Sequence, residues 1–185
     1  MAMKNPTKTY RLALIGVMTA ILCILGPLSI PLPFSPVPLS LTNFAILLAV
    51  FLLGWKWGTV SCGIYLLLGL VGVPVFSGFS GGMAKLLGPT GGYLVGFLLL
   101  AVISGLFVEK FEQARLPVAA GMALGMLVDY LFGTLWLAIL MKLSFGQALM
   151  IGVVPYLAGD AVKLIIALLL GSALRRRLQA LRILV

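Results

Sequence analysis

The chain has 185 residues and a formal net charge of +9; 62% of the residues are hydrophobic, only 9% are charged, and the mean hydropathy is +1.22. This composition excludes an ordinary soluble domain and predicts an integral membrane protein. The sequence has no histidine, and its two cysteines, Cys23 and Cys62, lie in separate apolar stretches, so we expect no metal site, no disulfide framework and no cofactor.

Six apolar segments are long enough, or nearly so, to span a bilayer core, which needs about 20 helical residues. The first is not interpreted as a signal peptide, because no A-x-A cleavage site follows it. Prolines between positions 27 and 38 prevent this helix from continuing, and Pro117 suits the first turn of a later one. We therefore predict an all-α integral membrane protein, with one membrane domain over residues 1–185 and six transmembrane helices near 10–28, 40–54, 57–72, 91–108, 117–140 and 148–174.

The distribution of lysine and arginine predicts how these helices are oriented. Of the 13 basic residues, Lys163 lies within a predicted span, Lys85 and Lys142 fall on one side, and the other ten fall on the side of both termini. By the positive-inside rule, both termini are cytoplasmic. The net charge therefore reflects topology and predicts no nucleic-acid partner, while contact of the "RRRLQALR" tail with anionic lipid or a partner protein is a secondary possibility. The ten are Lys4, Lys8, Arg11, Lys56, Lys110, Arg115, Arg175, Arg176, Arg177 and Arg182.

Two outward loops have an unusual composition. The first, "PLSIPLPFSPVPLS", is rich in proline and free of charge, which predicts a rigid connection. The second, "VPVFSGFSGGMAKLLGPTGG", mixes glycines with bulky apolar residues that a freely solvated linker would not carry. We therefore favour a folded lid or re-entrant loop over a flexible connector, with glycines that let the backbone approach a ligand.

The last predicted span contains an aspartate and a lysine within "GDAVK". Lys163 lies twelve residues before Arg175, at about 18 Å from the inner boundary, and Asp160 lies at about 22 Å, in the outer half of the membrane. Their i,i+3 spacing places both on one helix face. An unpaired charge at this depth costs on the order of 2.5 to 3.5 kcal/mol, so both must face the bundle interior. Just upstream, Pro155 frees the carbonyl of Ile151 and is expected to distort the helix.

Two interpretations of this pair stay open. In the first, Lys163 pairs with Asp160, or with Asp129 on the fifth span, and the pair only fixes helix packing. In the second, the pair belongs to a polar ligand site reached from outside, where Lys163 receives an anionic or carbonyl group and Asp160 accepts from N–H donors. Ionisable residues within membranes are functional more often than not, which favours the second interpretation.

Small residues recur in the first span. Gly16 and Ala20 are four residues apart in "LIGVMTAIL", a spacing typical of close helix contacts in membranes. Packing within the chain is the default interpretation, and contact with a partner subunit is the alternative.

Several of these segments together resemble the BioY family, the biotin-binding S component of energy-coupling factor (ECF) vitamin transporters. The resemblance is carried by "PFSPVPLSLTNFAILLAVFLLGWKWGTVSCGIYLLLGLVGVPVFSG", "GGMAKLLGPTGGYLVGF", "YLFGTLWLAIL" and "PYLAGDAVKLIIALLL", in that order. The glycine-rich loop and the G-D-x-x-K pair are its most specific motifs. It implies an ECF S-component-like bundle in the cytoplasmic membrane of a prokaryote, which binds biotin from outside and delivers it to a transmembrane coupling subunit driven by two cytoplasmic ATPases.

The resemblance also implies which residues contact the ligand. In that family the aspartate and lysine of the last helix contact biotin, which corresponds to Asp160 and Lys163 here. The tyrosine of the GGY motif corresponds to Tyr93, and the glycine-rich loop would contribute near Gly78 and Ser80.

Some relatives differ at three of the positions concerned: they have glutamine at Thr42, asparagine at Ser80 and arginine at Leu94. Thr42 is therefore included among the expected ligand contacts. The small residues of the first helix are where such proteins meet the coupling subunit, so Gly16 and Ala20 are the expected partner contacts.

The chemistry of biotin suits these residues. Its ureido ring carries N–H donors and a carbonyl, its thiophane ring is apolar, and its valerate chain ends in a carboxylate. We expect Asp160 to accept from a ureido N–H and Lys163 to donate to an oxygen of the ligand. The apolar part could be walled by Phe34, Phe76, Phe79 and Tyr93.

The leading hypothesis is therefore a biotin-capture subunit without catalytic activity, in a transporter whose ATP hydrolysis belongs to partner subunits. The alternatives are an S component for a different vitamin and a self-sufficient proton-coupled carrier with Asp129 and Asp160 as proton sites. An intramembrane enzyme is disfavoured, because the chain has only 4 acidic residues, no histidine and no paired-aspartate motif.

Overall fold

The computed structural model describes residues 8–111 and 114–180, so that Lys4 and Arg182, two of the basic residues counted above, lie outside these ranges. In chain order its elements are α1 (Lys8–Leu25), β1 (Ser29–Leu32), β2 (Ser35–Ser40), α2 (Thr42–Leu70), α3 (Met83–Leu87), α4 (Gly91–Lys110), α5 (Arg115–Met141), α6 (Phe145–Gly152), the 3₁₀ turn η1 (Val154–Tyr156) and α7 (Leu157–Ala180).

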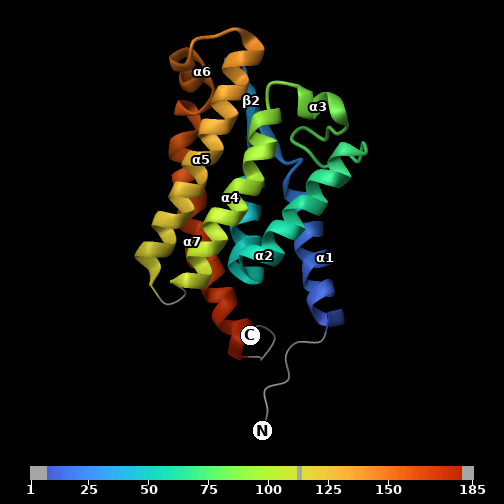
Figure 1. Ribbon diagram of the computed structural model, residues 1–185, viewed down its shortest axis with the longest axis vertical. Coiled ribbons are helices and arrows are strands. Elements are labelled where there is room, and N and C mark those ends of the chain that lie inside the picture. Colours follow the sequence, from blue (N-terminus) through green and yellow to red (C-terminus); the bar gives the residue numbers. More distant parts are fainter. Residues whose placement is uncertain (1–7, 112–113, 181–185) are drawn as a thin grey trace.

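The helices form an elongated bundle with two distinct ends (Figure 1). The first turns of α1 and the last turns of α7 lie at one end, which we call the terminal end, while α3, α6 and the β1–β2 hairpin lie toward the other, which we call the hairpin end. The described residues make six helical passes: α1, the two halves of α2, α4, α5, and the broken helix α6–η1–α7. The segments Thr42–Leu70, Gly91–Lys110, Arg115–Met141 and Phe145–Ala180 are long and apolar enough to cross a membrane, and the apolar helix Thr9–Leu25 is shorter. This arrangement confirms the predicted fold class.

Helix α2 is bent at Gly54, whose backbone is not helical (φ 78°, ψ 179°). A positive φ of this size is accessible to glycine at little cost. The N–H of Trp55, which begins the second half, donates to the Glu109 carboxylate at 3.1 Å and so satisfies a donor that the first turn of a helix leaves open. The predicted spans 40–54 and 57–72 are therefore the two halves of one bent helix.

The proline-rich outer loop forms an antiparallel two-stranded hairpin, β1 with β2, in which Ser29 pairs with Ser40 and Leu32 with Ser35. The proline-rich composition predicts a rigid connection there but no strands. Prolines are compatible with the hairpin because each strand has an edge that needs no ladder hydrogen bonds. The segment is rigid because its two halves are tied to each other.

The glycine-rich loop is folded, as its composition predicts. The backbone groups of Phe76 and Ser80 hydrogen-bond to each other at 2.9 and 3.2 Å. The Phe76 side chain is fully buried and meets the ring of Tyr65 edge to face, with centroids 5.6 Å apart. It fits over Gly69 of α2, where a Cβ atom would lie 2.1 Å from the phenylalanine ring. Phe76 thus anchors the loop on α2.

The last predicted span, 148–174, is not one continuous helix. Helix α6 ends at Gly152, the turn η1 contains Pro155, and α7 follows. Pro155 has no N–H to offer the carbonyl of Ile151, and that carbonyl accepts instead from the hydroxyl of Ser35 on β2 at 2.7 Å. The distortion predicted from Pro155 is confirmed, and it supplies the acceptor that joins the hairpin to the helices.

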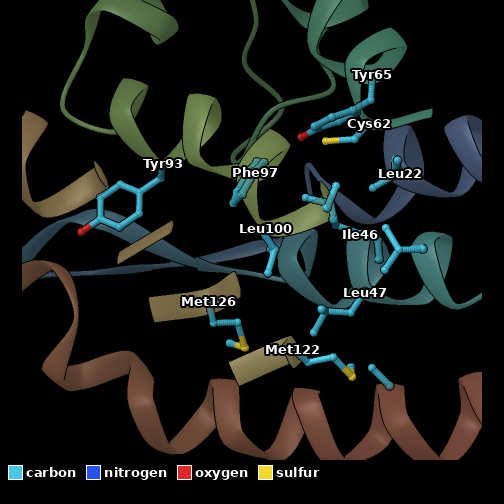
Figure 2. Close-up of a cluster of buried hydrophobic side chains, with 14 of the residues drawn as sticks. Leu22, Ile46, Leu47, Cys62, Tyr65, Tyr93, Phe97, Leu100, Met122 and Met126 are labelled. Carbon is cyan, nitrogen blue, oxygen red and sulfur yellow. The ribbon is translucent and has the colours of Figure 1, made fainter. Parts of the chain in front are cut away.

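The hydrophobic core lies where α2, α4 and α5 meet, with contributions from α1 and α7. Figure 2 shows Leu22, Ile46 and Leu100 among the side chains that fill it, with Met122 close by. Tyr93 lies at the edge of this cluster, and its hydroxyl points away from it (Figure 2). The packed core therefore fixes the ring of Tyr93 while its polar group faces the site described next.

Candidate ligand-binding site

The aspartate and lysine of the last helix form an ion pair in which the aspartate is buried and the lysine partly buried. Lys163 Nζ lies 2.7 Å from Asp160 Oδ1, and Asp160 is only 4% exposed. The other carboxylate oxygen, Oδ2, accepts from the hydroxyl of Tyr130 on α5 at 2.5 Å. Among the described residues Lys163 pairs with Asp160 and not with Asp129, so that alternative of the sequence analysis is not what the structure has.

Three hydrogen bonds tie strand β2 to the α6–η1–α7 segment, and we call them the clasp. In each of them a side chain donates to a backbone carbonyl, so each bond needs the correct position of only one side chain. Together they hold the hairpin over the ion pair. The three bonds run from Ser35 Oγ to Ile151 O at 2.7 Å, from the Tyr156 hydroxyl to Val37 O, and from Lys163 Nζ to Ser40 O at 2.5 Å.

A small cavity with a volume of about 50 Å³ lies beneath the clasp. Asp160, Lys163 and Tyr93, three of the predicted ligand contacts, line it together. The structure therefore brings these three residues into one site. Its other lining residues are Val37, Pro38, Leu39, Ser40, Asn43, Phe97, Asp129, Tyr130, Gly152 and Tyr156.

The aromatic wall differs from the one that was expected. Phe34 and Phe79 are 60% and 67% exposed, and Phe76 is buried in the core instead. Tyrosines and Phe97 take their place, because α4, α5 and η1 face the cavity, whereas the phenylalanines are on the outer loops. Of the four aromatic residues expected, only Tyr93 lines the cavity.

A second cavity, of about 40 Å³, lies beside the first and contains the predicted residue Thr42, together with Tyr65 and Thr90. The two cavities are neighbours, because five residues line both of them: Val37, Pro38, Ser40, Tyr93 and Phe97.

Neither cavity is large enough for a vitamin. Small-molecule sites in proteins have volumes of roughly 300 to 1,000 Å³, against about 50 and 40 Å³ here. Three of the residues between the cavities, Val37, Pro38 and Ser40, belong to strand β2. Strand β2 therefore forms part of the boundary between Thr42 and the ion pair.

Tyr93 is positioned by glycines on two other helices. Its hydroxyl donates to the carbonyl of Gly152 at 2.9 Å, at the point where α6 ends. A Cβ atom on Gly152 would lie 2.5 Å from this hydroxyl, and one on Gly133 would lie 2.2 Å from the ring. The interruption of the helix before Pro155 therefore leaves two backbone carbonyls free to accept hydrogen bonds, that of Ile151 from Ser35 and that of Gly152 from Tyr93.

Two predicted contacts, Gly78 and Ser80, lie outside both cavities. The N–H of Gly78 donates to Pro27 O at 3.1 Å, and the hydroxyl of Ser80 donates to Ser77 O at 2.8 Å, so both help to fold the loop. Ser77 and Thr90 are the residues of this loop that line the second cavity. Sequence alone carries no signal that separates Ser77 from Ser80, because the fold of the loop decides which hydroxyl turns inward.

Asp129 is a cavity residue that the sequence analysis considered only as a partner for Lys163 or a proton site. It lines the first cavity and is 1% exposed, and its Oδ1 has no hydrogen-bond partner among the described residues. Gly96 of α4 provides the space, since a Cβ atom there would lie 2.3 Å from Oδ1. Asn43 and Tyr130 also line the cavity and were not predicted. The site therefore holds an acceptor that no described residue satisfies.

Gly16 and Ala20 are both exposed on α1 and line neither of the two cavities of the site. A Cβ atom on Gly16 would have nothing within 4 Å. Gly16 therefore does not pack closely against another part of the chain, as the default interpretation would require. The face of α1 that carries Gly16 and Ala20 is exposed and accessible to another protein.

The comparisons with known proteins agree over nearly the whole chain. The profile of the BioY family matches residues 2–180. The chain is 39% identical over 161 residues to "Biotin transporter BioY" of Thermotoga maritima, which covers 87% of this chain and 93% of that protein. It is 37% identical over 168 residues to "Probable biotin transporter BioY" of Pyrococcus horikoshii, covering 91% and 98%. It is also similar to a solved structure described as "Crystal structure at 2.1 A of the S-component for biotin from an ECF-type ABC transporter", with a TM-score of 0.87, 35% sequence identity and 95% of each chain covered.

Proposed function

The chain belongs to the BioY family, and on that premise we propose that it binds biotin and takes it up as the substrate-specific subunit of an ECF-type ABC transporter in the cytoplasmic membrane of a prokaryote. The observation that carries this proposal is the buried Asp160–Lys163 pair at the wall of a cavity closed by the clasp. The protein has no catalytic role in it. A transmembrane coupling subunit and two cytoplasmic ATPases supply the energy.

In this proposal biotin replaces one hydrogen bond of the clasp. Lys163 stops donating to the carbonyl of Ser40 and donates to an oxygen of the ligand instead. The ammonium group of Lys163 is therefore hydrogen-bonded both before and after biotin binds. Asp160 keeps Tyr130 and Lys163 and accepts a ureido N–H through a remaining lone pair, since an ionised carboxylate has about four acceptor positions. Asp129 accepts the other ureido N–H, because its Oδ1 is unsatisfied and at the same cavity.

The remaining predicted contacts complete the proposed site. Tyr93, with Phe97, packs against the apolar thiophane ring, and Thr42 is reached when β2 moves and the two cavities merge. Gly78 and Ser80 act indirectly in this account, by folding the loop that presents Ser77. On α1, the exposed Gly16 and Ala20 receive the coupling subunit, because small residues let two helices approach closely.

The test is an isothermal titration of the detergent-purified protein with biotin, with thiamine and riboflavin as controls. We expect one biotin to bind per chain, and neither control to bind. Tight binding of thiamine or riboflavin without biotin binding would overturn the choice of vitamin while leaving the transporter class in place.

A self-sufficient proton-coupled carrier is the second candidate, and the unpartnered Asp129 is the observation that favours it. Uptake of labelled biotin into vesicles that contain this chain but no ATPase separates the two. The proposal predicts no accumulation with or without a proton gradient, whereas accumulation that follows the gradient would support the carrier.

A further inference from the structure

A larger cavity lies at the terminal end of the bundle, far from the clasp. Its volume is about 450 Å³, and it is bounded by the bend of α2, the start of α5 and the last turns of α7. This is within the range of small-molecule sites in proteins, and neither the biotin proposal nor the partner contacts on α1 use it. Its lining residues are Phe51, Arg115, Val118, Leu168, Ser172, Arg175, Arg176 and Gln179.

The chemistry of the wall changes in order along α7. On α7, Leu168, Ser172, Arg176 and Gln179 follow one another at helical spacing, so one helix face passes from apolar to hydroxyl to cationic toward the terminal end. Leu168 lies eight residues before Arg176, which corresponds to a depth of about 12 Å below it. This depth reaches the acyl region of a bilayer rather than its headgroup layer.

Helix α5 repeats the same order from the opposite wall. Arg115 is its first residue and is exposed, whereas Val118, one turn further in, is buried at 2% exposure. Because α5 begins here, its positive helix end adds to the charge of Arg115. Across the cavity Phe51 supplies a further apolar surface, and Arg175 donates to the Phe51 carbonyl at 2.8 Å, which fixes the floor between α2 and α7.

The charges and the apolar walls together indicate which class of ligand fits the cavity. Arg115 and Arg176 are exposed at the mouth, and among the described residues that line the cavity none is acidic. A free phosphate would use the arginines and leave the apolar depth unfilled. A protein partner approaching from the cytoplasm would meet the same rim, but its polar surface would not enter the acyl region. An anionic phospholipid matches both parts, because its phosphate and its acyl chain are joined in this order.

We propose that this cavity binds one anionic phospholipid of the inner leaflet, with its phosphate on Arg115 and Arg176 and one acyl chain along Phe51, Val118 and Leu168. The proposal depends on the orientation of the chain in the membrane and not on biotin. Failure of one therefore does not imply failure of the other.

The experiment measures lipid binding to the delipidated, detergent-purified full chain by native mass spectrometry and by thermal unfolding. Phosphatidylglycerol is the probe, phosphatidylcholine with identical acyl chains controls for the acyl part, and inorganic phosphate controls for the anion. We expect one tightly held phosphatidylglycerol and a raised Tm, at least tenfold weaker binding of phosphatidylcholine, and no shift with phosphate. Equal affinity for both lipids, or saturation by phosphate alone, would overturn the proposal.

Variants locate the site. R115Q/R176Q is expected to weaken phosphatidylglycerol binding about 30-fold, which corresponds to about 2 kcal/mol at 1.4 kcal/mol per tenfold. K56Q/K110Q removes two exposed charges from the same side of the membrane but outside the cavity, and it should bind as the original chain does. If both double variants lost the same amount of phosphatidylglycerol affinity, the loss would be due to net charge alone, and the proposal would be wrong.

Ser172→Trp provides a test that leaves every charge in place. Ser172 is at the middle of the cavity wall, so an indole there fills the path of the acyl chain. We expect loss of phosphatidylglycerol binding with the Tm in detergent alone unchanged. Unaltered lipid binding in Ser172→Trp, or an R115Q/R176Q variant that keeps its lipid but no longer copurifies with the coupling subunit, would assign the cavity to a protein partner instead.

Discussion

The hairpin end and the terminal end of the bundle hold their charges in opposite ways. At the hairpin end the buried Asp160 and the partly buried Lys163 are paired and covered by the clasp, beside cavities of about 50 and 40 Å³. At the terminal end Arg115 and Arg176 are exposed around a cavity of about 450 Å³. A ligand at the hairpin end must therefore exchange partners with the protein, whereas a ligand at the terminal end meets charges that already face outward.

Locking the clasp in its closed state should have the largest effect on ligand binding at the hairpin end. In the variant S35C/I151C a disulfide would hold β2 against the end of α6, at a contact that already brings Ser35 Oγ within 2.7 Å of Ile151 O. We expect biotin affinity to fall at least about 100-fold when the variant is oxidised and to return on reduction, because the binding-competent state is no longer populated. Titration with biotin before and after adding reductant measures this.

The control for the lock is the single variant S35C, treated with the same oxidant, since it retains the native Cys23 and Cys62. It should bind biotin under both conditions. If the oxidised double variant binds as tightly as the reduced one, the ligand does not enter by way of the hairpin.

Breaking the ion pair tests how strongly the hairpin end depends on its internal pairing. Asp160→Asn or Lys163→Ala leaves the other charge buried without its partner, which typically destabilises by about 3 to 5 kcal/mol. Because neutralising both charges removes that penalty, D160N/K163M should unfold closer to the original chain than either single variant. Thermal unfolding in detergent compares them, and a double variant less stable than both singles would be evidence against this explanation.

Crowding the contact between Tyr93 and the end of α6 should lower the stability by a smaller amount. Gly152→Ala introduces a Cβ atom 2.5 Å from the Tyr93 hydroxyl, and overpacking of this kind costs about 1 to 3 kcal/mol. Gly146→Ala is the matched control on the same helix, because nothing lies within 4 Å of a Cβ atom there. A lower Tm for G152A than for G146A is expected, and equal Tm values would show that the contact is easily rearranged.

Asp129 should give the smallest of these effects. Asp129→Asn keeps the shape of the side chain but replaces one acceptor oxygen with an amide donor, and we expect biotin affinity to fall about tenfold, since a typical hydrogen bond contributes about 0.5 to 1.5 kcal/mol. Ser104→Ala is the control, because Ser104 Oγ is also buried without a partner but lines neither cavity. If both substitutions change affinity alike, Asp129 does not contact the ligand.

How much of the site the sequence predicts depends on how far apart its contacts lie along the chain. The Asp160–Lys163 pair is an i,i+3 contact, and the free carbonyl before Pro155 is an i,i−4 effect, so helix geometry is enough to predict both. The clasp instead joins positions 116, 119 and 123 residues apart. Local patterns carry no information on such contacts.

Asp129 and Ser77 illustrate the same limit from the side of the cavity. The space for the Asp129 carboxylate comes from Gly96 on another helix, and Ser77 faces inward because Phe76 and Ser80 close a turn around it. In each case the residue type is visible in the sequence, while its role is set by packing between elements that only the fold brings together.

We propose that biotin binds at Asp160 and Lys163 beneath the hairpin. The most direct test is a biotin titration of the original chain, D160N/K163M and Lys142→Gln, in which Lys142 serves as an exposed lysine between α5 and α6, at the same end, that lines neither cavity. We expect the original chain and K142Q to bind biotin alike and folded D160N/K163M not to bind it. Unchanged biotin affinity in D160N/K163M would contradict the claim.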